Sequence, residues 1–323
     1  CAVDISDDAL FVTTLSQPVP GEVQEVCVWS WTKEDDAPLL KTTVLSGEIE
    51  TGIIFDGNNH FELSTWGPKT VTFWNWSEFN IEGYVGSISK GDLGAFGGRF
   101  TKCVFLPDGS TALTATDEGF IVLWETTFSK VLLGNVGDST LRTASKVVKL
   151  VESKISCMLT VNGYLALGCS DGSVRFYDHS LRLEAWFEDF AAGPVTSLSF
   201  SIQMCPFPEG EGGAPGLQFW APDFMVGTSD AFIVGVESQC FGEVRPEDRR
   251  GTLLMQGFAE EVTGVTCHPN RPLLALACFN GSLQVWDYEM KLLMNLREFN
   301  FTDPVDAAAR RSKPAFLRPN CFQ

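Results

Sequence analysis

The feature that most constrains this chain is a set of short apolar runs divided by tight turns near residue 280. Two of these runs, 262–267 and 273–278, have the length and composition of strands. Asn280-Gly281 separates the second run from a third, 282–287. We expect a tight hairpin at this pair, because both central residues of such a turn need positive φ. With a fourth strand predicted over 291–296, the segment forms one four-stranded antiparallel unit.

The same pattern of a turn followed by an apolar strand recurs five times upstream. The aligned strand ends are Trp29, Trp74, Trp124, Tyr177, Val236 and Trp286. Successive copies lie 45, 50, 53, 59 and 50 residues apart. The last copy ends in Trp286-Asp287, the dipeptide that names the WD repeat, whose usual period is roughly 40–45 residues. We therefore predict an all-β fold, a WD40-type β-propeller with six recognisable four-stranded blades.

The domain boundaries follow from where the strand pattern starts and stops. Residues 1–299 are predicted to form the propeller, and 300–323 a linker or the start of a further blade. The polar stretch 134–145 is interpreted as the link between the third and fourth blades. Because the chain has no initiating Met and the strand pattern looks cut at both ends, we expect it to be part of a longer protein. That protein would hold a seventh blade or, as a tandem-propeller protein, a second propeller. The predicted blades lie near residues 1–46, 49–89, 99–134, 147–188, 194–256 and 261–297.

The charge balance argues against nucleic acid as a partner, and the short apolar runs argue against a membrane. The sequence holds 41 acidic and 23 basic residues, a net charge of −18. Such a surface repels phosphate backbones. No apolar run reaches the roughly 18 residues of a membrane span, so no membrane contact is expected.

The cysteines indicate a reducing compartment. None of the ten stands three residues from another, so no Cys-x-x-Cys metal or redox pair exists. Cys103, Cys157, Cys267 and Cys278 fall inside apolar strands, where Cys behaves as a small buried hydrophobic residue.

The candidate catalytic and metal-binding patterns favour structural roles. Residues 168–172 match Gly-x-Ser-x-Gly, but a nucleophile elbow needs a helix after the turn, and here a strand is predicted. The three histidines, His60, His179 and His268, occupy unrelated repeat positions, so no zinc or acid–base site is expected. We predict no catalytic residue, no metal and no cofactor.

Short polar side chains recur at the turn into the third strand of the blades. They are Asp117, Asp171, Asp230 and Asn280, and we expect them to hydrogen-bond the turn backbone. The turn at Asp117 is aligned with one extra residue. WD repeats often join such an Asp to a His and the strand Trp in a buried network. No Gly-His dipeptide occurs here, so that network is predicted to be incomplete.

Two long loops are the candidate contact sites for other proteins. The first, 203–218, is rich in Pro and Gly and carries Glu209 and Glu211. The second, 239–250, ends in Arg249 and Arg250, whose simpler interpretation is solvated loop charge.

Several stretches resemble one family. VRFYDHSLRLEAWFEDFAAGPVTSLSFS (174–201), VGTSDAFI (226–233) and VTGVTCHPNRPLLALACFNGSLQVWDYEMKLL (262–293) are similar to the cilia- and flagella-associated protein 251 family, which are WD-repeat proteins of the motile axoneme. The likeness covers most of 24–299. The insertion at 203–218 and the tail after Phe299 depart from it.

The resemblance implies a non-catalytic scaffold at the base of radial spoke 3, located in the cytoskeleton of the cilium or flagellum. The implied partners are radial-spoke proteins, subunits of the calmodulin- and spoke-associated complex, calmodulin and the doublet microtubule. Because the chain is acidic, contact with the acidic microtubule surface is expected to be indirect or confined to basic loops. The alternative is a general WD-repeat adaptor, in ubiquitin ligation or trafficking, that binds peptide motifs.

Overall fold

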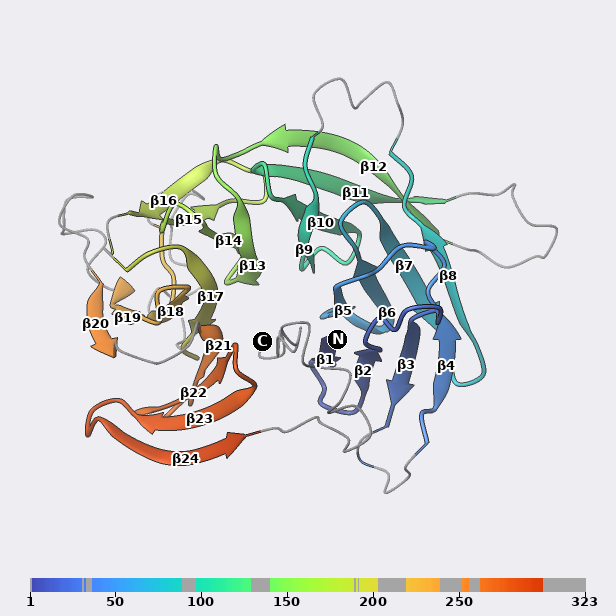
Figure 1. Cartoon of the computed structure of the whole chain (residues 1–323). Coiled ribbons are helices and arrows are strands. Elements are labelled where there is room, and N and C mark those ends of the chain that lie inside the picture. The colour runs from blue at the N-terminus through green and yellow to red at the C-terminus, as the bar shows by residue number, and fades with distance from the viewer. Residues whose placement is uncertain are drawn as a thin grey trace, which may run out of the picture. The chain divides into compact units, whose positions relative to one another are not determined.

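The computed structural model describes residues 2–30, 32, 37–88, 97–128, 140–188, 190, 192–202, 219–238, 251–255 and 262–298. Within these ranges it contains 24 strands in six four-stranded sheets and no α-helix (Figure 1). The predicted all-β fold with six four-stranded blades is confirmed. In every sheet the strands are hydrogen-bonded in chain order, as blades built from successive hairpins require.

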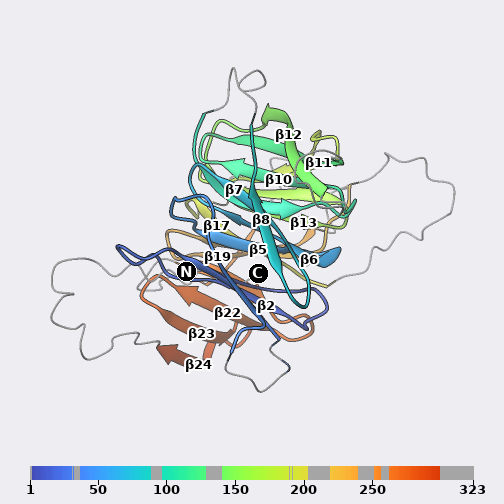
Figure 2. The same cartoon turned by 90° about the vertical axis from the view of Figure 1, so that its right-hand side faces the viewer.

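The chain divides into two compact units, 1–167 and 168–323. The first unit holds blade one, β1 (Ala2–Ile5), β2 (Val12–Leu15), β3 (Glu25–Trp29) and β4 (Leu40–Thr43). It holds blade two, β5 (Gly52–Asp56), β6 (Asn59–Trp66), β7 (Val71–Trp76) and β8 (Ile81–Val85), seen from the side in Figure 2. It also holds blade three, β9 (Phe100–Phe105), β10 (Thr111–Thr116), β11 (Phe120–Phe128) and β12 (Thr140–Lys149).

The division between the units falls within the fourth sheet. That sheet is β13 (Ile155–Val161), β14 (Tyr164–Cys169), β15 (Val174–Tyr177) and β16 (Leu183–Phe187). The second unit also holds blade five, β17 (Val195–Phe200), β18 (Phe224–Thr228), β19 (Ile233–Val236) and β20 (Thr252–Met255). Blade six is β21 (Val262–Cys267), β22 (Leu273–Cys278), β23 (Ser282–Asp287) and β24 (Leu292–Glu298).

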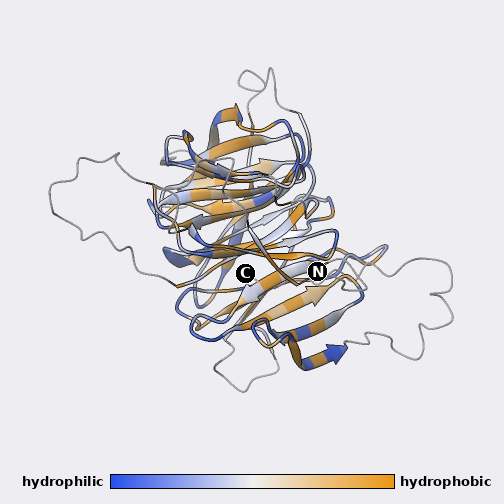
Figure 3. Cartoon of the chain, turned by 90° about the vertical axis from the view of Figure 1, so that its left-hand side faces the viewer, coloured by the Kyte–Doolittle hydropathy of each residue, from blue (hydrophilic) through white to orange (hydrophobic). Residues whose placement is uncertain are grey.

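The core of the first unit lies between the faces of neighbouring blades. Successive side chains of a strand point to opposite faces of its sheet, so each blade presents one set of side chains to each neighbour. Figure 3 shows apolar residues along strands of the blades. Leu63 and Trp74 of blade two pack against Val26 and Val28 of blade one. From the opposite face of blade two, Phe73 packs against blade three. Blade two is therefore apolar on both faces.

The second unit uses the same arrangement with different residues. Phe176 of β15 contacts Phe200 and Phe224 of blade five, with ring centroids 6.0 and 5.7 Å apart. Blades five and six share a cluster that includes Ile233, Val262 and Leu276. Aromatic and branched side chains thus fill these blade contacts.

The predicted boundary between blades three and four is wrong. Thr140–Lys149 pairs antiparallel with Phe120–Phe128 as the outer strand of blade three, so this blade extends to residue 149 rather than 134. The fourth sheet begins at Ile155 and not at 147. Half of the predicted polar link is therefore a strand, in which Arg142 is buried and Ser145 is exposed.

The expected hairpin at Asn280-Gly281 is present, but its backbone differs from the prediction. Gly281 has φ of 81°, whereas Asn280 is not among the residues with positive φ. The Gly281 N–H donates to the Cys278 carbonyl at 3.0 Å. The connection is thus a type I-like turn that ends on a left-handed glycine, for which only one residue needs positive φ.

Candidate protein-interaction site

One four-residue turn recurs in four blades and carries the predicted polar residues. In each turn the fourth residue donates its N–H to the first carbonyl and has positive φ. The four turns run from Thr116 to Gly119, from Cys169 to Gly172, from Thr228 to Ala231 and from Cys278 to Gly281.

The polar residues of these turns do two different things. Asp171 and Asn280 accept a hydrogen bond from the N–H two residues later, in Ser173 and Ser282, both at 2.9 Å. This is the backbone bond that the sequence predicts.

Asp117 and Asp230 instead face the segment before the first strand of their own blade. Asp117 accepts a 2.6 Å bond from the Arg99 N–H, and the Asp230 carboxylate lies against Gly193. The turn at Asp117 has no extra residue. Asp117 stands one position earlier in the turn than its counterparts, which removes it from the place that binds the turn backbone.

The strand-end tryptophans of blades one to three make the same indole–hydroxyl bond. The indole N–H donates to a Thr hydroxyl of the second strand, always at 2.9 Å. In each blade that Thr lies two residues beyond the residue opposite the Trp, so the two side chains meet diagonally. The pairs are Trp29–Thr14, Trp74–Thr65 and Trp124–Thr114.

The remaining blades lack this Thr. In blade six the diagonal position is Leu276, and the Trp286 indole donates to Gln284 at 2.8 Å instead. Tyr177 and Val236 end the corresponding strands of the fourth and fifth blades, and both side chains are buried. The tryptophan–threonine bond therefore belongs to the first unit.

In blade two the buried network continues to a carboxyl. Glu50 accepts a 2.9 Å bond from the Thr72 hydroxyl and is also hydrogen-bonded by Thr65, the partner of Trp74. Burial raises the pKa of Glu50, while these hydroxyls oppose the rise. The Gln24 amide of blade one binds both the N–H and the carbonyl of Glu50, at 2.7 and 3.0 Å. Neither Gln24 nor Glu50 lies in a motif that predicts this contact.

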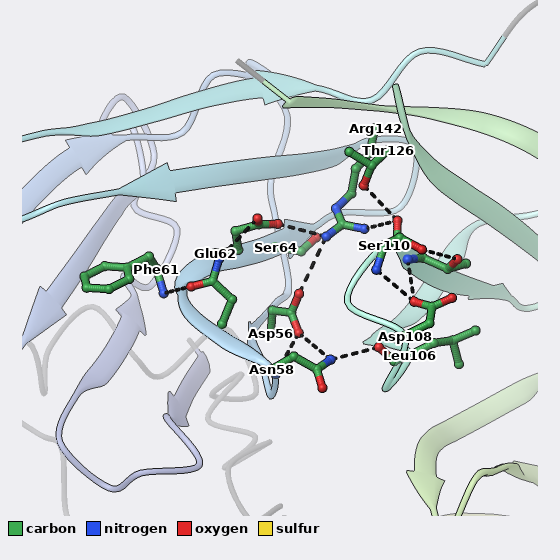
Figure 4. Close-up of polar contacts among 12 residues, drawn as sticks. Asp56, Asn58, Phe61, Glu62, Ser64, Leu106, Asp108, Ser110, Thr126 and Arg142 are labelled. Carbon is green, nitrogen blue, oxygen red and sulfur yellow. Dashed lines mark hydrogen bonds and ion pairs between the residues drawn. The ribbon is translucent and has the colours of Figure 1, made fainter. Parts of the chain in front are cut away.

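Arg142, a buried cation among the described residues of the first unit, joins blade three to blade two (Figure 4). Its guanidinium contacts the Glu62 carboxylate at 2.8 Å and the Asp56 carboxylate at 3.6 Å. It also donates to the Ser110 carbonyl at 2.6 Å. The side chain is 4% exposed, so these bonds lie away from bulk water. The pair of carboxylates compensates the buried positive charge.

Aromatic groups complete the surroundings of Arg142. The guanidinium carbon lies 5.1 Å from the Phe105 ring centroid and 5.9 Å from that of Phe73, within the range of cation–π attraction. Its backbone N–H donates to the Tyr84 hydroxyl at 2.6 Å. Burial raises the pKa of Tyr84 to about 12, so the phenol stays neutral.

The second carboxylate of this network is tied to both blades. Asp56 accepts bonds from the backbone and side-chain amides of Asn58, at 2.9 and 3.1 Å. The Asn58 amide also donates to the Leu106 carbonyl of blade three at 2.9 Å. Burial raises the pKa of Asp56, and Arg142 acts in the opposite direction. The network is a structural contact between blades two and three, in which the polar groups bind one another.

A group of aromatic side chains lies between blades one and two, on the face of β6 opposite to Arg142. Figure 4 shows Phe61 pointing away from the guanidinium. We call Phe11, His60, Phe61 and Trp76 the aromatic patch. His60 lies 4.2 Å from Phe61 and 5.1 Å from Phe11 between ring centroids, and Phe11 meets Trp76 edge-on at 4.9 Å.

The His60 ring of the aromatic patch has an acidic neighbour. Its Nδ1 lies 2.8 Å from an Asp8 carboxylate oxygen. Hydrogen bonds from the Ser6 hydroxyl and the Leu10 N–H lower the pKa of Asp8. Asp8 is therefore an ionised side chain that orients the imidazole.

The predicted contact loops lie outside the described residues. Glu209, Glu211, Arg249 and Arg250 all fall there. The described part of the chain holds no group of three His, Cys, Asp or Glu residues that could bind a metal ion. Within the same ranges no helix has the length and hydropathy to cross a bilayer. Ser170 lies in the hairpin turn between β14 and β15, so a strand follows it, as expected.

The six four-stranded sheets, the Trp within the third strand of four of them and the turn that recurs in four blades define the chain as a WD-repeat β-propeller protein. The model of the WD domain, G-beta repeat family, matches residues 251–287. The fold is similar to the crystal structure of the Cps50 (Swd1) β-propeller domain from Myceliophteria thermophila. That similarity has a TM-score of 0.62 at 16% identity and covers 88% of this chain and 82% of that one.

The chain belongs to the cilia- and flagella-associated protein 251 family. The CFAP251 N-terminal domain model matches residues 1–241. The chain is 35% identical over 315 residues to the cilia- and flagella-associated protein 251 of Chlamydomonas reinhardtii, covering 92% of this chain and 38% of that protein. The protein of that name from Tetrahymena thermophila is 30% identical, with 93% and 32% covered. The chain thus spans less than two fifths of these relatives, and its resemblance to the family is confirmed.

Proposed function

We propose that this chain is a non-catalytic scaffold of the motile ciliary axoneme, located at the base of radial spoke 3. There it links the spoke, the doublet microtubule and regulatory complexes, among them the calmodulin- and spoke-associated complex and calmodulin. Family membership carries this proposal, because relatives at 30–35% identity over nine tenths of this chain are named for cilia and flagella.

The polar chemistry of the blades supports a structural role. The buried carboxyls Glu50 and Asp56 bind Thr72, Asn58 and Arg142. An acid or base for catalysis needs access to a substrate. Asp56 instead joins blade two to blade three through Arg142, and Glu50 binds hydroxyls within blade two, as a stiff support for contact loops would need.

The test uses the full-length protein in cells that build motile cilia. A tagged copy replaces the native one, and isolated axonemes are cross-linked with and without calcium and analysed by mass spectrometry. We expect cross-links to proteins of the radial spoke 3 base and to calmodulin. A tagged WD-repeat propeller of the cytosol serves as the control. Cross-links confined to another spoke would refute the position.

The same experiment separates the scaffold from the adaptor alternative. A general WD-repeat adaptor would yield ubiquitin-ligase or coat subunits and no axonemal protein. The variant R249E/R250E tests the basic loop within the same strain. If that loop carries the contact, its cross-links disappear while the others remain.

A further inference from the structure

The aromatic patch has the composition and rigidity of a binding anchor. Trp76 is 5% exposed, and its indole N–H is fixed by the His60 carbonyl at 2.6 Å. Phe61 packs on Trp76 with centroids 5.1 Å apart, yet 43% of its surface stays exposed. Aromatic groups that are held in place before binding lose little entropy on contact. They also contribute much of the energy of protein interfaces.

Two further exposed apolar side chains lie close to the patch residues in the sequence. Leu10, next to Phe11, is 46% exposed. Phe79, three residues after Trp76, is 90% exposed in the turn between β7 and β8. An isolated exposed hydrophobic residue needs no explanation, but Phe61 is exposed while it packs in a contiguous aromatic group, as at an interaction site.

The surroundings of the patch are acidic. Asp7 and Asp8 precede Leu10, the Asp7 carboxylate lies against Gly57 in the turn before His60, and Glu78 precedes Phe79. Residues 1–32, 42–68 and 70–89 contain no Lys or Arg. The buried Arg142 of blade three is bound by Glu62 and Asp56 on the opposite face of β6.

We propose that the aromatic patch binds a basic segment of another protein. A large apolar side chain of that segment would pack on Phe61 and Phe11. Lys or Arg residues beside it would lie near Asp7, Asp8 and Glu78, and over the aromatic faces. Nucleic acid and anionic lipid are disfavoured as occupants because the same carboxylates repel them. The proposal deepens the scaffold function, on which it rests, by assigning a surface and a partner chemistry.

The test is direct binding of defined peptides to the purified chain. The probe is a set of fluorescein-labelled 12-residue peptides with one Trp or Leu flanked by Lys and Arg. A matched set of acidic peptides carries Glu and Asp at the positions of Lys and Arg. Fluorescence anisotropy should show basic peptides binding at least tenfold more tightly than the matched acidic peptides. That preference should weaken with added salt, because charge attraction is screened.

Two variants locate the site, and two matched variants control for them. Phe61→Ala and Asp7→Lys change exposed side chains, and each should weaken binding of the basic peptides at least tenfold. Leu183→Ala and Glu184→Lys make the same kinds of change in β16, where Leu183 is also 43% exposed, and should leave binding unchanged. Circular dichroism confirms that all four variants remain folded.

Three results would overturn the proposal. They are equal affinity for acidic and basic peptides, equal losses in all four variants, and no saturable binding by any basic peptide. None of these would affect the axonemal cross-links that test the scaffold function. Conversely, loss of those cross-links would leave the peptide binding intact, so the two failures are distinguishable.

Discussion

The contribution of a tryptophan–threonine bond to stability depends on how deeply the bond is buried. Trp124 and Trp74 are each 1% exposed, whereas Trp29 is only partly buried. All three donate to Thr over the same distance. A buried indole N–H that loses its acceptor destabilises the folded state by the full desolvation free energy of that donor. An indole N–H near water can instead donate to a water molecule.

We therefore expect Thr114→Val to destabilise the chain by about 2 kcal/mol, because the buried Trp124 donor would be left without its acceptor. Thr14→Val is the matched control, since it makes the same change beside the more exposed Trp29. Its cost should be below about 1 kcal/mol. Urea unfolding, followed by tryptophan fluorescence, measures both. Equal costs at the two sites would contradict the role given to burial.

A second residue-scale effect concerns pH. Asp4 of β1 accepts a 2.7 Å bond from the Phe55 N–H of β5, and burial raises its pKa from 3.8 to about 6. The folded state therefore holds the Asp4 proton more tightly than the unfolded state does. This contribution to stability is complete below pH 3.8 and is lost as the pH rises through about 6.

Asp4→Asn keeps an acceptor for Phe55 but removes the charge. Relative to this variant, the unmodified chain should lose about 1 kcal/mol of stability between pH 5 and pH 7. Unfolding free energies at several pH values measure the difference. Glu50 and Asp56 titrate in both proteins, so their effects cancel. A constant difference across this range would show that Asp4 does not titrate as described.

At the scale of elements, the recurring hairpin turn uses glycine in three blades but alanine in the fifth. Ala231 has φ of 62°, a left-handed conformation in which its Cβ is strained. We expect Ala231→Gly to stabilise the chain by about 0.5–1 kcal/mol, and Gly281→Ala to destabilise it by about 1 kcal/mol. Thermal unfolding of the two variants provides the measurement. Shifts of the same sign would be inconsistent with a shared turn.

Among the contacts between elements, loss of the Arg142 network should lower the free energy of unfolding the most. Arg142→Leu would leave Asp56 and Glu62 without their cation and should cost about 3 kcal/mol or more. Arg175→Leu is the control, because Arg175 is 24% exposed and lies 3.5 Å from Asp171. Its loss should cost below about 1 kcal/mol. If denaturant midpoints show similar costs, the Arg142 network is not structural.

The elements that could be predicted are those whose signal is local. The bounds of β21, β22 and β23 agree with the predicted runs, because turn residues flank each of them. β12 was missed because eleven residues separate it from β11 and its composition is mixed. Arg142 and Glu62 are 80 residues apart, so no local pattern connects them. The aromatic patch likewise joins two blades, and its residues were not identified as a group.

At the scale of the whole molecule, net charge governs which surfaces the chain can approach. With a charge of −18, the purified chain should remain in the supernatant when acidic microtubules are sedimented at physiological salt. The full assembly would then need another subunit for that contact. If the unmodified chain and the R249E/R250E variant both sediment with microtubules, this expectation is contradicted. If only the unmodified chain sediments, the contact is assigned to the basic loop.

The polar contacts between blades also distinguish positions that tolerate substitution from positions that do not. Gln24 and Arg142 contribute side chains, but they bind the main-chain groups of Glu50 and Ser110. Every amino acid supplies that carbonyl, so substitution of the exposed Ser110 leaves the bond available. Replacement of Arg142 removes it. Inherited variants at these contacts would therefore be unequal in their consequences, with harm concentrated on the residue that contributes its side chain.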